Sequence, residues 1–207
     1  MQKNNFINII LVTLIFQKKL FMKKMILSAF CFCIFSFVLS FYSTAQSLSS
    51  ADIKDQMVKD WQRGKSYTID YLNTMPADKY SFKAVDSLRS FAQQMLHLAA
   101  ANVFLMMNAT GQPPFSWLSF DLEGRTTAQK KDSVMYFITT SYDYCINAVK
   151  NSDATKWAEK TKMFDRFEQT RFALMNKVFE HQTHHRGQTT IYIRLQGIVP
   201  PQERLFD

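Results

Sequence analysis

The chain has few residues of the kinds that interrupt or cross-link a fold. Five glycines and five prolines in 207 residues exclude a collagen-like or low-complexity protein, and three cysteines exclude a disulfide framework. Apolar side chains make up 47% of the sequence, which excludes a wholly disordered chain. The length fits one domain, or at most two.

Acidic residues are missing from the first 45 positions, which nevertheless carry five lysines. The formal net charge of +8 therefore falls to +3 over the rest of the chain, where 20 basic side chains face 17 acidic ones. So small an excess gives no electrostatic reason to expect nucleic acid as a partner.

Residues 1–45 have the order of a targeting segment. A Met-Lys-Lys triplet at positions 22–24 is followed by an uncharged apolar run and then by Ser-Thr-Ala, which ends at Ala45. A basic start, an apolar centre and a small final residue are typical of a secretory signal peptide. We expect translation to begin at Met22, cleavage after Ala45, and a protein exported to the periplasm or secreted. The alternative is an uncleaved anchor, which would be the only contact with a membrane.

The exported part, residues 46–207, shows helical rather than strand periodicity. Apolar residues recur at three- and four-residue steps, and no run alternates with a period of two for long enough to argue for a sheet. This pattern predicts an all-α fold, a four-helix bundle. The expected helices span about 50–73, 86–108, 127–151 and 165–196, with Asp86 as the N-cap of the second and Gly197 closing the fourth.

Two further features are expected to belong to the core. Cys145 lies on the apolar face of the third predicted helix and is interpreted as a small core residue rather than a nucleophile. The loop 112–125 contains Phe115, Trp117 and Phe120, whose rings are expected to pack back on the bundle.

Three of the four histidines lie within five residues, at positions 181, 184 and 185. Each helical residue advances about 100°, which places His185 about 40° from His181 on the apolar side and His184 about 60° away at the edge. Two imidazoles one turn apart on a buried face can hold a metal ion. The same count assigns to this inward face the apolar residues Phe167, Leu174, Val178, Tyr192 and Leu195.

The fourth histidine, His97, lies in the middle of the second predicted helix. Ala101, one turn further on, is small and leaves room beside the imidazole. Three neutral imidazoles from two facing helices would make a three-nitrogen site with an open position for water or substrate. The alternative is that the histidines are hydrogen-bonded core residues, although an uncompensated cluster of polar rings would be costly. The face around His97 also carries Ser90, Gln93, Phe104 and Asn108.

Two blocks of the sequence resemble the DinB/YfiT-like superfamily. One is HQTHHRGQTTIYIRLQGIVPP at 181–201, and the other is FAQQMLHLAAANVF at 91–104, with a single histidine in the second helix. The resemblance extends from about residue 52 to the C-terminus. It implies an up-up-down-down helix bundle, a bound divalent metal, nickel or zinc in many members, and frequent homodimers. The metal ligands that it implies are His97, His181 and His185.

The resemblance also limits the functions to be considered. Members with assigned activities include thiol S-transferases, mycothiol-dependent isomerases and amide hydrolase-like proteins, and the family name does not imply DNA repair here. We therefore expect an exported metal-dependent enzyme, of thiol S-transferase or hydrolase type, that acts on a small-molecule substrate. The alternative is a non-catalytic exported bundle that binds a metal or ligand.

No general base can be named from the sequence. Glu180 lies about 100° from His181 and is expected to be a solvated or an interhelical charge. Gln188 and Tyr192 share the inward face and are candidates to orient a metal-bound water or a ligand, or to be ordinary polar groups at the edge of the core. Arg186 points away from the site by the same count, which favours a role in helix packing or in a dimer contact.

Overall fold

The computed structural model describes residues 17–32, 48–119 and 121–206. Residues 17–32 are helical, and their side chains are exposed. The chain separates after Ser47 into an N-terminal part and a compact unit, Leu48–Asp207. Among the described helices, none is both long enough and apolar enough to cross a membrane. The predicted cleavage after Ala45 lies outside the described residues.

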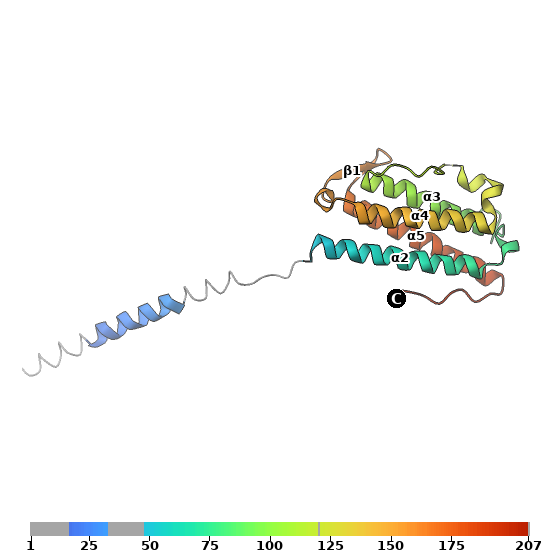
Figure 1. Cartoon of the computed structure of the whole chain (residues 1–207). Helices are drawn as coiled ribbons and strands as arrows, with labels where there is room; N and C mark the ends of the chain where they lie inside the picture. Colours follow the sequence, from blue (N-terminus) through green and yellow to red (C-terminus); the bar gives the residue numbers. More distant parts are fainter. Residues whose placement is uncertain (1–16, 33–47, 120, 207) are drawn as a thin grey trace, which may run out of the picture. The chain divides into compact units, whose positions relative to one another are not determined.

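The compact unit is a bundle of four long helices that lie side by side in Figure 1. They are α2 (Ser50–Thr74), α3 (Phe91–Thr110), α4 (Lys131–Asn151) and α5 (Arg171–Leu195). The connections contain the 3-10 helices η1 (Ala77–Lys79), η2 (Leu122–Gly124), η3 (Thr126–Gln129) and η4 (Ala154–Lys156). The predicted all-α four-helix bundle is confirmed.

The contacts of α2 show its direction relative to two neighbours. The hydroxyls of Tyr71 in α2 and Thr190 in α5 lie 2.9 Å apart. Seven residues earlier in α2, the carbonyl of Gly64 accepts from Arg186, which comes before Thr190 in α5. Because both contacts advance in the same direction, the two helices are parallel. The end of α2 lies instead beside the start of α4, where Lys131 donates to the carbonyl of Asn73. Helix α4 is therefore antiparallel to α2.

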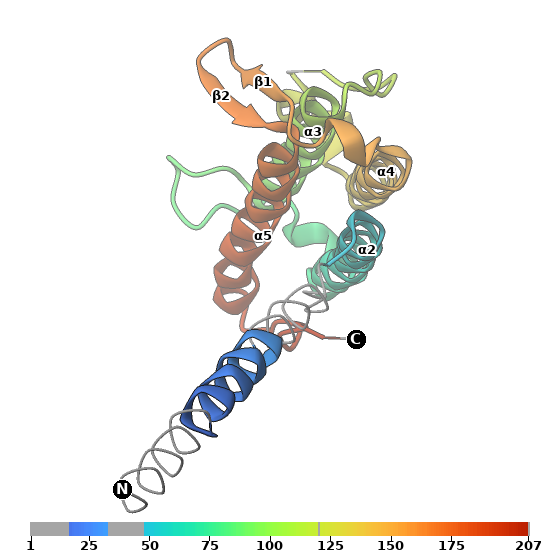
Figure 2. The same ribbon diagram turned by 90° about the vertical axis from the view of Figure 1, so that its left-hand side faces the viewer.

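Helix α3 completes the arrangement on the opposite side of the bundle, between α4 and α5 (Figure 2). The start of α3 lies beside the end of α5, where Gln94 donates to Gln188. The end of α3 lies beside the start of α5, where Arg171 donates to the carbonyl of Ala109. The order of directions is therefore up-down-down-up, and the implied up-up-down-down order is wrong. The long connection 111–130 accounts for the difference, because it returns the chain along the bundle between the parallel helices α3 and α4.

The second helix begins later than the sequence pattern suggested. Asp86 was expected at its N-cap, but Ser90 occupies that position and its hydroxyl accepts from the amide of Gln93. The Gln93 side chain accepts in return from the amide of Ser90, which closes a capping box. A helix starting at residue 86 would lack this reciprocal pair. The third helix likewise begins at Lys131, after η3, rather than at residue 127.

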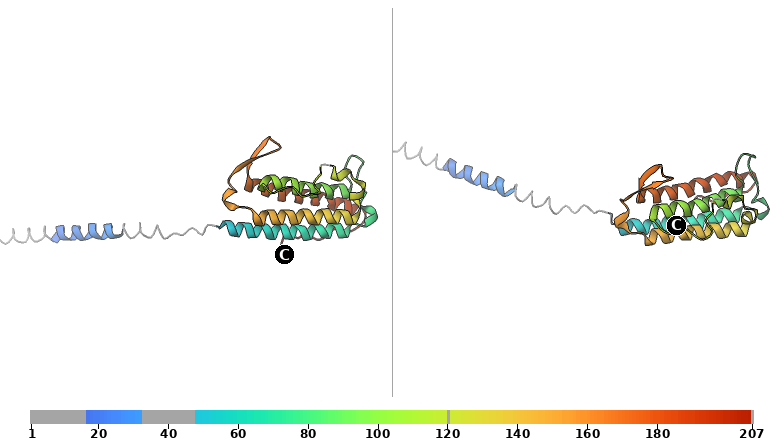
Figure 3. Two further views of the ribbon diagram at one scale, coloured as in Figure 1. Left: turned by 45° about the horizontal axis from the view of Figure 1, so that its top comes forward. Right: turned by 90° about the horizontal axis from the view of Figure 1, so that it is seen from above.

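A two-stranded antiparallel hairpin, missed from the sequence, precedes α5 (Figure 3). It consists of β1 (Lys160–Met163) and β2 (Phe167–Thr170). Asp165, the expected start of the fourth helix, lies in the hairpin turn with a φ of 52°, and Thr170 caps the helix instead. Strands of four residues offer too few alternations to stand out against a helical pattern.

The core lies between the four helices and is rich in aromatic and long aliphatic side chains. Trp61 of α2 is fully buried and makes edge contacts with Tyr142 and Phe179. Cys145 is buried as predicted, and burial raises the pKa of its thiol well above the usual value. Trp117 packs on Phe137 and Phe115 on Tyr144, as expected for these two rings, whereas Phe120 lies outside the described residues.

Arg186 belongs to a polar network in the contact between α2 and α5. Its guanidinium donates to the side chain of Gln182 at 2.7 Å and lies over the ring of Tyr67. It also donates to the hydroxyl of Thr68. The side chain is buried and faces α2, so it serves helix packing within the bundle, as the helical count predicted.

Gly64 is the weakest helix-forming residue in the middle of α2. A Cβ there would lie 3.5 Å from a ring carbon of Tyr142 and 3.6 Å from one of Phe179, which is ordinary van der Waals contact. We therefore expect Gly64→Ala to raise the free energy of unfolding by about 0.5–1 kcal/mol in urea denaturation. Gly187→Ala on α5 is the control, because a Cβ there meets nothing within 4 Å and the substitution therefore changes helix propensity without adding a contact. A loss at Gly64 beside a gain at Gly187 would contradict the expectation.

Candidate metal centre

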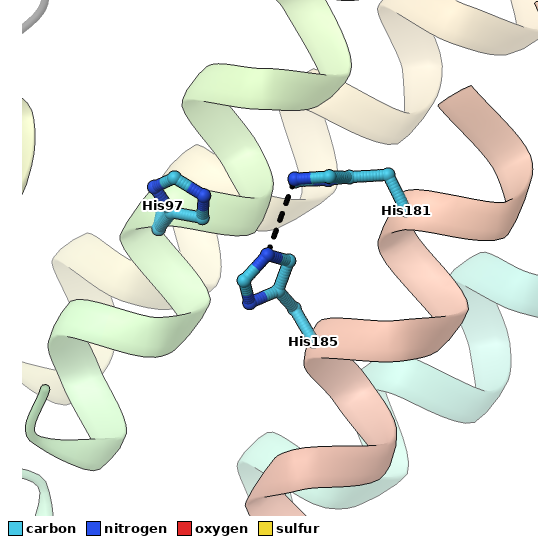
Figure 4. Close-up of side chains that lie close together, drawn as sticks. All are labelled: His97, His181 and His185. Carbon is cyan, nitrogen blue, oxygen red and sulfur yellow. Dashed lines mark hydrogen bonds between the residues drawn. The ribbon is translucent and has the colours of Figure 1, made fainter. Parts of the chain in front are cut away.

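Three histidines meet in the contact between α3 and α5. His97 projects from α3, and His181 and His185 project from successive turns of α5 (Figure 4). The Nε2 atoms of His181 and His185 lie 3.1 Å apart, and one nitrogen from each of the three rings lies within 4.8 Å of the other two. The structure thus brings together all three residues that were predicted to bind a metal.

The spacing of the two α5 imidazoles fits a shared ion. Nitrogens that each lie about 2.0–2.1 Å from zinc at angles between a right angle and a tetrahedral one are about 2.8–3.4 Å apart. The observed 3.1 Å falls in this interval. Nδ1 of His181 is buried without a hydrogen-bond partner among the described residues. The residues present therefore fit a divalent metal.

The tautomer of His185 is determined by a chain of side-chain amides. Nδ1 of His185 lies 2.9 Å from Oε1 of Gln94, an acceptor, so this nitrogen carries the proton. Gln94 donates in turn to Oε1 of Gln188, and Gln188 donates to Nε2 of His184. The lone pair of His185 is therefore on Nε2, directed at His181, as a metal ligand requires.

A carboxylate that the sequence analysis missed orients the third imidazole. Oε1 of Glu123 lies 2.5 Å from Nδ1 of His97, and its Oε2 lies 2.5 Å from Nε of Arg89. Because an ionised carboxylate only accepts, Nδ1 of His97 carries a proton, and Nε2 is the nitrogen of this ring that is left for a metal ion. The sequence analysis weighed only Glu180 as a carboxylate near the site, whereas the structure places Glu123 there.

Glu123 was missed because it comes from η2, in the aromatic loop, and not from either helix that carries the histidines. A helical count cannot place a loop residue. Nothing in the local sequence distinguishes Glu123 from the neighbouring acidic residue Asp121.

Burial keeps the two α5 imidazoles neutral. Loss of solvent lowers the pKa of His181 to about 4 and that of His185 to about 3, and the neighbouring imidazoles contribute in the same direction. A neutral imidazole has the free lone pair that a metal ligand needs. The site is therefore ready to bind a cation at neutral pH without losing protons from these two rings.

The other residues considered in the sequence analysis lie outside this cluster. His184 is exposed, and Glu180 is exposed and paired with Lys177, as predicted. Gln188 and Tyr192 do not touch the three imidazoles directly: Gln188 acts through Gln94, and Tyr192 donates to the carbonyl of Arg89. Two residues assigned to the inward face are exposed instead, Phe167 in β2 and Leu195 at the end of α5.

Two of the cavities that border the cluster differ in character. One, of about 350 Å³, is bordered by His97, His181 and Glu123, and the rest of its wall is almost entirely apolar. The other lies on the side of His185 and is lined by polar side chains that include Arg89 and Gln94. A ligand can therefore approach the imidazoles from an apolar side and from a polar side.

The comparisons with known proteins agree with this architecture. Residues 45–205 match the model of the DinB family. The fold is similar to that of a DinB-like protein from Bacillus cereus (TM-score 0.62, 14% identity, 72% of this chain and 96% of that one). It is also similar to that of a DinB-like protein from Bacillus subtilis (TM-score 0.52, 16% identity, 72% and 99%). A search of curated proteins finds no match. With the family model spanning the whole bundle, the chain belongs to the DinB family.

Proposed function

We propose that this protein is an exported metal-dependent enzyme that binds one divalent ion, nickel or zinc, through His97, His181 and His185. The observation that carries the proposal is the convergence of three imidazole nitrogens at the wall of a cavity. A histidine that only fills a core needs hydrogen-bond partners, whereas three lone pairs directed at one point need a cation.

The residues around the imidazoles have separate tasks. Glu123 holds the ring of His97, and Gln94 holds that of His185, each through Nδ1. Such partners orient ligands and raise their basicity. When bound, a divalent ion supplies Lewis-acid polarisation of a substrate oxygen, sulfur or water. The apolar wall beside His97 and His181 keeps bulk water away from the reacting groups.

The reaction that we propose is hydrolysis or thiol S-transfer on a small molecule. One observation favours an alternative to catalysis, namely a bundle that binds a metal or ligand without turnover. Glu123 is the only carboxylate among the described residues that line the apolar cavity, and both of its oxygens are already hydrogen-bonded. It is therefore a positioning residue rather than a free general base.

Export and a homodimeric state are also part of the proposal. Export is supported by the basic triplet at 22–24 and the apolar run that follows it. The homodimer is supported by the family resemblance, and nucleic acid is not proposed as a partner.

The metal site is tested by removing one imidazole at a time. We expect His97→Ala, His181→Ala and His185→Ala each to lose bound metal, measured by elemental analysis of the purified protein, and to retain their helical circular dichroism spectrum. His184→Ala is the comparison variant, because His184 is exposed, is not one of the three clustered ligands and reaches His185 only through Gln188 and Gln94. Equal metal loss in His184→Ala and His185→Ala would contradict the assignment.

The same proteins separate an enzyme from a binding module. Turnover of thiol acceptors, esters or amides by the metal-loaded wild type, absent from His185→Ala, supports catalysis. Full metal occupancy without turnover across the panel supports the non-catalytic alternative.

Glu123→Gln tests the support of His97. We expect metal affinity, measured by competition with a chelator, to fall by roughly 10–100-fold, because the amide removes the charge that raises the basicity of the ring. Glu180→Gln is the matched control, since Glu180 is exposed and paired with Lys177. Unchanged affinity in Glu123→Gln would show that this contact does not act on the ligand.

Export is tested by mass spectrometry of the protein secreted from a bacterial host. We expect the mature chain to begin at Gln46, because a small residue precedes the cleaved bond. Ala45→Phe should block this cleavage. An exported wild-type protein that keeps residues 22–45 would support the membrane anchor instead.

A further inference from the structure

We infer that the ligand of this site carries an uncharged apolar chain or ring, which lies in the cavity beside His97 and His181, and a polar head that reaches the three imidazoles. The inference names a substrate class for the proposed metal site and rests on that proposal. It starts from the contrast between the two ends of the cavity: nitrogen ligands at one end, and apolar side chains over the rest.

The described residues of the cavity wall offer no group that is free to bind a charged tail. Helix α3 contributes Ala100, Phe104 and Leu105, and the aromatic loop contributes Leu118 and Leu122. The described lining residues include no lysine or arginine, and the one carboxylate is engaged by His97 and Arg89. A charged tail would therefore lose its hydration without gaining a partner. The volume of about 350 Å³ suits a small-molecule group.

Ala101 creates the entrance from the metal site. It lies one helical turn beyond His97 on the same face of α3 and borders the cavity. A longer side chain at this position would fill the space directly beside the imidazole. The methyl group of Ala101 thus leaves a continuous path from the nitrogen ligands into the apolar part.

The tip of the hairpin forms the outer rim of the cavity. Phe164 has a φ of 54°, in the left-handed region that a bulky residue rarely adopts. Its ring is 64% exposed and is stacked on that of Phe104, with centroids 5.6 Å apart. A large exposed ring held in this backbone conformation at the mouth of an apolar cavity is placed to cover an apolar ligand.

Alkyl hydroxamates of increasing length are probes that match this geometry, because the hydroxamate chelates a metal and the alkyl chain enters the cavity. With the zinc-loaded full chain, we expect calorimetric affinity to rise about two- to fourfold for each added methylene from acetohydroxamate to octanohydroxamate. A carboxylate at the end of the chain should lower the affinity relative to the alkyl compound of equal length.

Two variants change the cavity in opposite directions. Ala101→Phe should remove the gain in affinity that each added methylene gives, because the ring fills the path into the apolar part of the cavity. Leu118→Ala, which shortens a half-buried loop side chain, should extend the gain to longer chains. Ala77→Phe is the matched control, since Ala77 is exposed in η1 and borders none of the cavities described here.

The outcomes separate this inference from the proposed function. Binding of acetohydroxamate with no gain from longer chains, or tighter binding of the carboxylate-tailed compound, would overturn the inference alone. No binding of acetohydroxamate would refute the metal site. Binding in the apolar cavity is then measured separately, on metal-free protein, by the fluorescence of the neutral probe N-phenyl-1-naphthylamine. Enhanced fluorescence that Ala101→Phe abolishes supports an apolar ligand, and no enhancement overturns it.

Discussion

The contact between α3 and α5 buries a row of polar side chains, and each of them needs a partner because an unpaired buried polar group is costly. The hydrogen bonds of this row all point the same way: His185 donates to Gln94, and Gln94 donates to Gln188. That direction leaves a lone pair on Nε2 of His185, facing Nε2 of His181 at 3.1 Å. A proton or a metal ion must lie between the two nitrogens. The geometry of the metal site thus follows from the hydrogen-bond requirements of the helix contact.

Helix α5 is polar on two sides, and each side serves a different neighbour. Gln182 and Arg186 face α2 and α4: Arg186 donates to Thr68 of α2, and Gln182 accepts from Tyr142 of α4. His181 and His185, one position earlier in each turn, face α3. Since one helical step turns about 100°, consecutive residues of the block HQTHHRGQ enter separate networks. The block therefore specifies the packing of α2 on α5 as much as it specifies a metal site.

The sequence predicts the parts of this molecule that depend on long periodic segments. The four helices, the core position of Cys145 and the shared face of His181 and His185 follow from three- and four-residue spacing. Short elements were not predicted, since the hairpin strands have only four residues each. The start of α3 was also misplaced, because two residues are suited to the N-cap position, Asp86 and Ser90, and only Ser90 forms a capping box. The helix directions, which were taken from the family resemblance, were wrong. Periodicity could not correct them, because it carries no information on how a long connection such as 111–130 crosses the bundle.

The chemistry of the site depends most on the segment that periodicity describes least. The loop between α3 and α4 supplies Glu123, which orients His97, and also Leu118 and Leu122, which line the apolar cavity. Arg89, in the connection before α3, supports Glu123 from the other side. The helices hold three nitrogens in place, whereas these connections determine how one nitrogen is oriented and what lies beside it. Two members of the family can therefore share the helical block and the histidines and still bind different ligands, because the ligand is selected by loop residues that the shared fold does not constrain.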